Sequence, residues 1–202
     1  MQQSVFKNLI MDSKSDISNT DKLYHGQNRR GNPFKDMKKY IKTGNQQEGP
    51  GVYFGSYTVA SSYGNFIYET IETISEINQN KIFLPSRKPI STVKMFYNRL
   101  PELFRNLSKK SDDNLENMFY LISDWIEIYE PEDLLDNDSI FDDFAKSIKN
   151  DDARNFFITM ADNFGGDFVD EFNKIYPKIY GLFNDDLNYY VFLKPIETRE
   201  LH

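Results

Sequence analysis

The residues best suited to chemistry lie in one stretch near the start of the chain. A Leu-Tyr-His-Gly run ends at Gly26, and about two dozen residues later the sequence reads Gly-Pro-Gly-Val-Tyr-Phe-Gly, ending at Gly55. His25 precedes a glycine, so it falls at a strand end where the backbone can approach a ligand closely. The Gly-Pro-Gly turn places Tyr53 on a new strand, and Tyr63 follows after Ala-Ser-Ser. Together these residues predict a flat slot for an aromatic heterocycle, with backbone hydrogen bonds to its polar edge.

Short strands must position this slot. Residues 23–91 hold most of the turn-forming glycines and prolines, and the apolar pieces between them predict strands at Leu23-Tyr24, Val52–Phe54, Phe66–Tyr68 and Lys81–Leu84. A β-type run over Asn188–Leu193 comes late and needs those strands to form a sheet. We expect a short helix over Asp36–Lys42, and another within residues 1–22 followed by a linker.

From about Thr92 the apolar residues recur every three or four positions, which predicts amphipathic helices. The first stripe runs from Leu115 through Trp125 to Tyr129, and we expect Trp125 and the phenylalanine stripes in the core. Later stripes reach the break at Gly165-Gly166 and then Pro177. The prediction is an α+β chain with a helical insertion over 92–177, before the last strand, in a sheet domain of 23–91 and 178–202.

Composition excludes several classes of site. The chain has 202 residues, no Cys, and two His of which one is the last residue, so a thiolate or multi-His metal site is not expected. A net charge of -7 argues against a general nucleic-acid coat, and the acidic run from Asp112 to Asp152 predicts a solvated helix face. We expect no membrane span and no signal peptide, hence a cytoplasmic protein.

The pattern in residues 23–68 resembles the ADP-ribosyltransferase fold, in the branch shared by poly(ADP-ribose) polymerases and diphtheria toxin. Its motifs are most similar to those of domains encoded by bacteriophages and mobile elements, in which Tyr-His-Gly precedes Gly-x-Gly-x-Tyr-Phe and Ala-x-x-Tyr-Gly. The similarity extends loosely to 180–196 and does not cover the helices. The resemblance implies a small split sheet, NAD as the substrate, no metal, and transfer of one ADP-ribose unit to a host macromolecule, more readily a protein than a nucleic acid.

The resemblance also implies roles at the nicotinamide end of NAD. The backbone N–H and C=O of Gly26 would bind the carboxamide. Tyr63 would stack on the nicotinamide ring, and Tyr53 would lie on the opposite side of that ring. A hydroxyl at Ser61 or Ser62 would reach the amide. This arrangement would hold the leaving group while the ribose develops oxocarbenium character.

At the other end of NAD, the resemblance assigns His25 to a ribose hydroxyl of the adenosine half. Arg29 and Arg30 follow in the next loop, where a cation would meet the pyrophosphate. Residues 1–50 hold nine Lys or Arg against five Asp or Glu, so the segment that would face NAD is locally basic although the chain is acidic. A local contact with a nucleic-acid acceptor therefore stays open.

The late strand departs from the family pattern. Active members place a Glu before this strand to hydrogen-bond the nicotinamide ribose, whereas the present chain has Asn188 there. We expect Asn188 and Tyr53 to be the catalytic residues. An asparagine can hydrogen-bond a hydroxyl but supplies no negative charge. Two alternatives follow: transfer that uses Asn188 or a nearby carboxylate (Asp185, Asp186 or Glu197), or a catalytically silent fold that acts as a binding or anti-defence protein. In a third alternative the resemblance is accidental, and the chain is a helical interaction protein with a small sheet.

Overall fold

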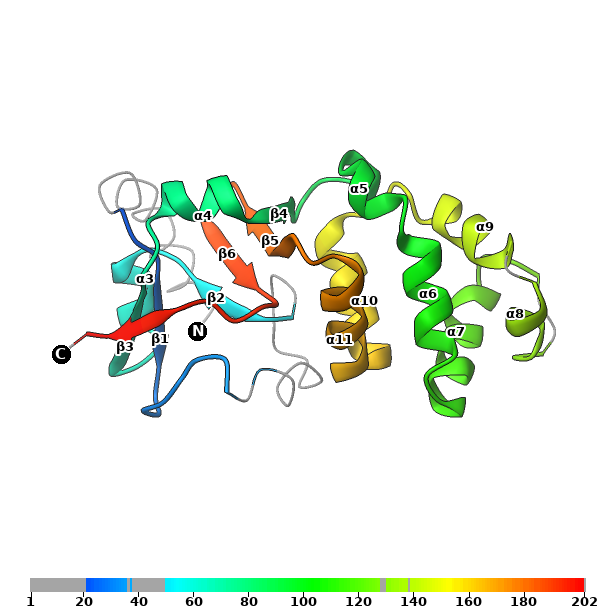
Figure 1. Cartoon of the computed structure of the whole chain (residues 1–202), viewed down its shortest axis with the longest axis horizontal. Helices are drawn as coiled ribbons and strands as arrows, with labels where there is room; N and C mark the ends of the chain where they lie inside the picture. The colour runs from blue at the N-terminus through cyan, green and yellow to red at the C-terminus, as the bar shows by residue number, and fades with distance from the viewer. Residues whose placement is uncertain (1–20, 36, 38–49, 128–129, 138, 202) are drawn as a thin grey trace, which may run out of the picture. The chain divides into compact units, whose positions relative to one another are not determined.

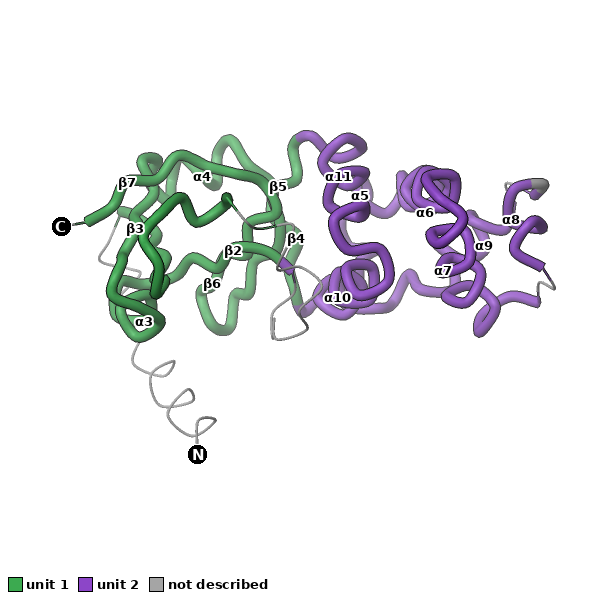
Figure 2. The backbone as a smooth tube through the Cα atoms, turned by 90° about the horizontal axis from the view of Figure 1, so that it is seen from below, with its two compact units in different colours: residues 1–37, 51–86, 178–202 green, residues 38–50, 87–177 purple. Residues whose placement is uncertain are grey.

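The computed structural model describes residues 21–35, 37, 50–127, 130–137 and 139–201. Apart from residues 21, 22 and 37, the segments 1–22 and Asp36–Lys42, where helices were expected, lie outside the described residues. The chain divides into two compact units (Figure 2). Unit 1 contains the described residues up to Met37 together with 51–86 and 178–201, and unit 2 contains 87–177. Within the described residues, unit 1 carries all the strands and unit 2 is helical, so the expected α+β class is confirmed.

Unit 1 contains two small sheets (Figure 1). In the first, β3 (Phe66–Thr70) lies between β1 (Tyr24–Gln27) and β7 (Thr198–Glu200), and both pairings are antiparallel. In the second, the order is β2 (Val52–Phe54), β6 (Tyr189–Phe192), β5 (Ile179–Asn184) and β4 (Ile82–Pro85). The β4–β5 pair is parallel, and the two other pairs are antiparallel.

Among the residues that the structure describes, a single bridge joins the two sheets. Tyr24 and Gly55 exchange two backbone hydrogen bonds, each 2.9 Å long, and the pairing of β1 with β2 ends there. Past this bridge β1 continues along β3, while β2 continues along β6.

The expectation of one strand after the helices was wrong, because three follow them. The predicted run corresponds to β6, but β5 lies between it and β4. The apolar signal of β5 is interrupted by Gly181, which has a φ of +155°, and a Cβ there would lie 1.8 Å from the Val191 carbonyl oxygen. The glycine is therefore required by strand contact rather than by a turn.

Two short helices connect the strands of unit 1. Helix α3 (Tyr57–Ser61) begins at Ser56, whose hydroxyl accepts from the Val59 N–H. Helix α4 (Ile74–Asn80) begins with a capping box, in which Thr73 and Glu76 each accept from the other's backbone N–H.

Unit 2 consists of a 3-10 turn at Ile90–Thr92 and seven α-helices among the described residues. They are α5 (Lys94–Tyr97), α6 (Leu100–Ser108), α7 (Asp112–Ser123), α8 (Asp133–Asp136), α9 (Ser139–Ser147), α10 (Ala153–Phe164) and α11 (Gly166–Ile175). Helix α10 begins at Asp152, whose carboxylate accepts from the Asn155 N–H, and ends at Gly165, whose φ is +54°.

Aromatic side chains form the core of unit 2, as the phenylalanine stripes predicted. Phe157 lies fully buried at the centre, with ring centroids 5.4 Å from Phe168 and 5.2 Å from Phe172. The Tyr176 hydroxyl donates to the Phe96 carbonyl, so the one polar atom of that buried ring is satisfied.

Trp125 does not belong to this core, and the prediction that it does was wrong. Its side chain is 54% exposed, whereas Met118 and Ile122 of the same stripe are fully buried. The cause is the end of α7: Ser123 is its last residue and Asp124 its C-cap, so Trp125 lies beyond the helix and leaves the buried face. The expected helix ends before the predicted Tyr129.

Candidate functional site

His25 lies in β1, and each of its two ring nitrogens faces a protein oxygen. Its Nδ1 lies 2.8 Å from the Tyr53 carbonyl oxygen, which can only accept, so Nδ1 carries the proton. Its Nε2 lies 3.3 Å from the Gln27 Oε1, an acceptor to which it can donate only when the ring is protonated. The ring lies 5.5 Å from the Phe54 ring. Burial lowers the pKa of His25, although the hydrogen bonds to Tyr53 and Gln27 oppose the shift. The imidazole is therefore neutral at pH 7.

The hydrogen bond from His25 to the Tyr53 carbonyl takes the place of a backbone hydrogen bond between β1 and β2. After the Tyr24–Gly55 bridge, the next antiparallel pair would join the Gly26 N–H to the Tyr53 carbonyl. That carbonyl accepts from His25 instead. Backbone groups alternate direction along a strand, so the N–H and C=O of Gly26 point to the same edge as those of Tyr24. Neither group makes a hydrogen bond to another described residue, and this open pair is termed the Gly26 edge.

Glycine is required at position 26 by close packing. A Cβ there would lie 1.8 Å from the carbonyl oxygen of Ala60 in α3. The turn after α3 is equally close to the end of β1, since a Cβ at Gly64 would lie 2.2 Å from the Gln27 backbone. These contacts place the segment that carries Tyr63 directly beside the strand that carries Gly26.

The predicted tyrosines lie on one face of β2. Side chains alternate along the strand, so Tyr53 shares a face with Gly55, and Phe54 lies on the other face beside His25. The Tyr189 ring covers Gly55, where a Cβ would lie 3.0 Å from it. A side-chain hydrogen bond links Tyr189 to Tyr63, whose ring is 45% exposed. Burial raises the pKa of the Tyr63 hydroxyl despite that hydrogen bond.

The tyrosine face, defined by Tyr53, Gly55, Tyr63 and Tyr189, thus lies on the opposite side of β2 from the His25 imidazole. Asn188 belongs to the tyrosine face, since it precedes Tyr189 and its carbonyl oxygen lies 4.0 Å from the Cβ position at Gly55. Asn188 has a φ of +52°, a conformation that asparagine tolerates better than most residues. It closes the turn between β5 and β6.

The two serines are engaged within α3. The Ser61 hydroxyl donates to the Thr58 carbonyl at 2.9 Å, and the Ser62 hydroxyl donates to the Val59 carbonyl at 2.7 Å. A contact from either hydroxyl to a bound amide would require a rotation of the side chain.

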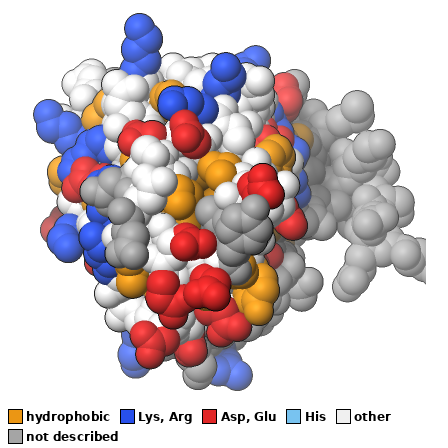
Figure 3. Space-filling view, turned by 90° about the vertical axis from the view of Figure 1, so that its right-hand side faces the viewer, with side chains coloured by type: hydrophobic (Ala, Val, Ile, Leu, Met, Phe, Trp, Pro, Cys, Tyr) orange, Lys and Arg blue, Asp and Glu red, His pale blue; other side chains and the backbone are white. Residues whose placement is uncertain are grey.

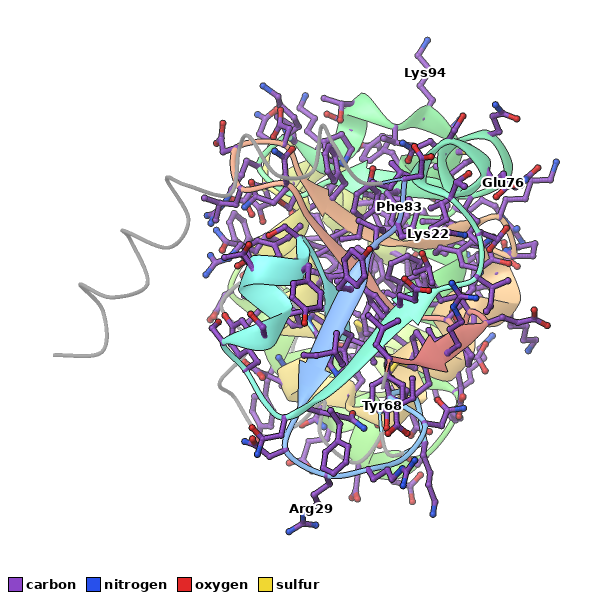
Figure 4. All side chains as sticks on the ribbon, turned by 90° about the vertical axis from the view of Figure 1, so that its left-hand side faces the viewer. Lys22, Arg29, Tyr68, Glu76, Phe83 and Lys94 are labelled. Carbon is purple, nitrogen blue, oxygen red and sulfur yellow. The ribbon has the colours of Figure 1, made fainter. Side chains whose placement is uncertain are left out.

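The loop after β1 is tied to the first sheet. The Gln27 side-chain amide donates to the carbonyls of Arg29 and Gly31, both at 2.7 Å. The Gly31 N–H donates to the Tyr68 hydroxyl at 2.8 Å, and Arg30 pairs with Glu200 at 3.0 Å. Arg29 points away from the ribbon (Figure 4). Of the two arginines expected at a pyrophosphate, Arg30 is therefore already paired with a carboxylate.

Two residues at this loop were missed in the sequence. Tyr68 stands opposite His25 and Glu200 stands opposite Tyr68, so the three side chains form a row across β1, β3 and β7. We term them the His25 row. The sequence alone could not indicate that these three side chains align, because a row across strands depends on the register between segments far apart in the chain.

The carboxylates considered beside Asn188 are spread out. Asp185 and Asp186 are exposed in the β5–β6 turn, where the buried Asn184 side chain accepts from the Asp186 N–H. Glu197 lies before β7, and its carbonyl accepts from the Ile71 N–H.

Comparisons with family models, with curated proteins and with solved structures give no match to this chain. Within the described residues, no helix is both long and apolar enough to cross a membrane, and no three His, Asp or Glu side chains gather in a way that could hold a metal ion.

Proposed function

We propose that unit 1 binds NAD and transfers a single ADP-ribose unit from it to a macromolecular acceptor. The observation that carries the proposal is the Gly26 edge, a backbone donor and acceptor side by side that no described residue occupies. A primary carboxamide offers the complementary pair, an N–H₂ donor and a C=O acceptor, in one plane. Nicotinamide carries such a carboxamide on an aromatic ring.

The tyrosine face supports the same ligand. Tyr63 offers a partly exposed ring near the end of β1, and its hydrogen bond to Tyr189 fixes its orientation. An aromatic ligand stacked on an ordered tyrosine gains about 0.5–1.5 kcal/mol beyond its buried area. The split between the sheets at Tyr24 and Gly55 agrees with the split sheet that the resemblance implies.

In the proposed reaction the C1′–N bond of the nicotinamide ribose breaks, and neutral nicotinamide leaves with the bonding electrons. A nucleophilic oxygen or nitrogen of the acceptor forms the new bond to C1′ and loses its proton to solvent. The Gly26 edge would hold the leaving group, while Asn188 would orient a ribose hydroxyl without stabilising the positive charge of the transition state. We therefore expect slow turnover.

The test measures nicotinamide released from NAD by the full chain, with and without a cell extract as the source of acceptors. The proposal predicts a rise in melting temperature with nicotinamide and time-dependent release. Tyr63→Ala should weaken nicotinamide binding about tenfold, since stacking is worth roughly 1 kcal/mol or more. Tyr120→Ala, which truncates an exposed tyrosine of α7 outside the proposed site, is the matched control and should bind as the wild type does. Absence of both binding and release would overturn the proposal.

A catalytically silent NAD-binding or ADP-ribose-binding protein is the second candidate. Two observations favour it: Asn188 supplies no carboxylate, and both nitrogens of His25 already face protein groups. It predicts a melting-temperature rise with NAD or ADP-ribose but no nicotinamide release above the uncatalysed rate. The same two measurements therefore separate the candidates.

A further inference from the structure

A second candidate surface lies in unit 2 and is independent of the NAD proposal. Residues 111–145, which include α7 and α8, contain twelve Asp or Glu and no Lys or Arg. The whole chain has a net charge of -7, so the other residues sum to -7 + 12 = +5. The acidity of the protein is therefore concentrated in this segment, which we term the acidic segment.

Several of these carboxylates lack a compensating partner. Asp143 pairs with Lys146 at 2.7 Å. The side chains of Asp124, Glu130 and Glu132 are exposed and make no hydrogen bond or ion pair to another described residue. Like charges held close together repel one another, and an approaching cationic surface removes that cost.

Apolar side chains are exposed among these acids. Trp125, the only tryptophan, is 54% exposed, and Leu135 is 41% exposed in α8. Figure 3 shows the end of the helical unit, where acidic side chains gather around apolar ones. An exposed tryptophan that follows Asp124 and precedes Glu127 in the sequence favours a partner with both apolar and cationic groups, because Lys and Arg bind tryptophan faces as well as carboxylates.

We propose that the described residues of the acidic segment form a docking surface for a basic amphipathic segment of a partner protein. Charge complementarity selects this occupant: lysine and arginine side chains would pair with the uncompensated carboxylates, and apolar groups would cover Trp125 and Leu135. A nucleic acid would be repelled, and a purely apolar partner would leave the carboxylates without counter-charges.

Trp125 is also the natural probe for the test. A synthetic tryptophan-free helix of leucine and lysine is titrated into the full chain while tryptophan emission is recorded, and the same helix with glutamate for lysine is the control peptide. The proposal predicts a saturable blue shift with the lysine peptide only. Its dissociation constant should rise at least about tenfold between about 0.05 and about 0.5 M salt, as screening requires.

Charge variants separate a specific surface from general attraction. The variant Asp124→Asn, Glu130→Gln, Glu132→Gln should weaken binding about tenfold. The matched control Asp162→Asn, Asp185→Asn, Asp186→Asn removes the same charge from exposed positions elsewhere and should leave it within about twofold. Equal weakening by both variants, or an equal shift with the glutamate peptide, would overturn the proposal. The proposal would also be overturned if the lysine peptide caused no shift in the wild-type chain. Thermal unfolding checks that both variants are folded.

Discussion

The imidazole of His25 takes the carbonyl of Tyr53 that the backbone of Gly26 would otherwise bind. The imidazole N–H of His25 thus donates where the Gly26 N–H would, and the two sheets of unit 1 separate at this point. This hydrogen bond leaves the Gly26 edge open and holds a neutral histidine beneath the loop that follows β1. The same hydrogen bond thus has a structural role and creates the feature on which the NAD proposal rests.

Replacing Gly26 with alanine should be severely destabilising. The new Cβ would lie 1.8 Å from the Ala60 carbonyl oxygen, so α3 would have to move away from β1. Overpacking against backbone typically costs about 1–3 kcal/mol or more. Chemical denaturation should show this loss, whereas Ser61→Ala, at an exposed position of the same helix, should change stability by less than about 0.5 kcal/mol. A Gly26→Ala protein of wild-type stability would contradict the close packing.

The stability of the protein should decrease as the pH falls through the range in which histidine titrates. Burial lowers the pKa of His25 in the folded state below its ordinary value of 6.5. The unfolded chain therefore binds the proton first, and the free energy of unfolding falls as the pH drops below about 6.5, by at most about 1.4 kcal/mol per pH unit. Urea unfolding between about pH 7.5 and about pH 5.5 measures the slope. His25→Asn should flatten it, although that variant is less stable at pH 7.5; an unchanged slope would contradict the prediction.

Removing the Tyr68 hydroxyl should loosen the loop after β1. In Tyr68→Phe the Gly31 N–H loses its acceptor, which costs about 1 kcal/mol. We expect the melting temperature to fall by about 2–4 °C and limited proteolysis within residues 28–35 to accelerate. Tyr57→Phe, at an exposed ring in α3, is the control. If both variants behave alike, Tyr68 does not tie the loop.

Two substitutions at Asn188 should have opposite effects on stability. Asn188→Gly relieves the positive φ and should stabilise the fold by a few tenths to about 1 kcal/mol. Asn188→Glu should destabilise it by a similar amount, but it supplies the carboxylate that the proposed reaction lacks. Under the transferase proposal, nicotinamide release should rise in Asn188→Glu. An unchanged rate with nicotinamide still bound would favour the silent alternative.

A pair of aromatic truncations should distinguish core from surface in unit 2. Phe157→Ala opens a cavity among buried rings and should cost about 3–5 kcal/mol. Trp125→Ala removes a larger but mostly exposed ring and should cost less than about 1 kcal/mol. Calorimetry or denaturant unfolding of the two variants measures the difference. Similar costs would mean that Trp125 is buried in solution.

The helical part of the fold was largely predictable because its signal is local. The stripe through Phe156 and Phe164, the cap at Asp152 and the break at Gly165 all fall within neighbouring turns of one helix. Trp125 was misplaced for a reason equally local: the spacing continued past the end of α7, but the helix did not. Periodicity marks a face only as far as the backbone stays helical.

The sheet and the site were less predictable because they depend on pairing at long range. The residues 179–184 were passed over since Gly181 interrupts their pattern, although β5 joins β4 to β6. The sequence indicated His25, Gly26 and Tyr63 as neighbours, but not that His25 and the tyrosine face lie on opposite sides of β2. Nor did it indicate Tyr68 or Glu200. Such relationships follow from register, which one sequence specifies only weakly.

The strand order has a consequence for synthesis of the chain. Every pairing in the sheet β2-β6-β5-β4 includes β5 or β6, so none of its backbone hydrogen bonds can form until the chain has been made beyond residue 178. By then all of unit 2 has been translated, and its helices depend on local contacts that form quickly. The helical unit can therefore fold first on the ribosome, while β2 and β4 are still unpaired in the nascent chain. Those exposed strands make unit 1 the part most prone to aggregate in a stalled or truncated chain.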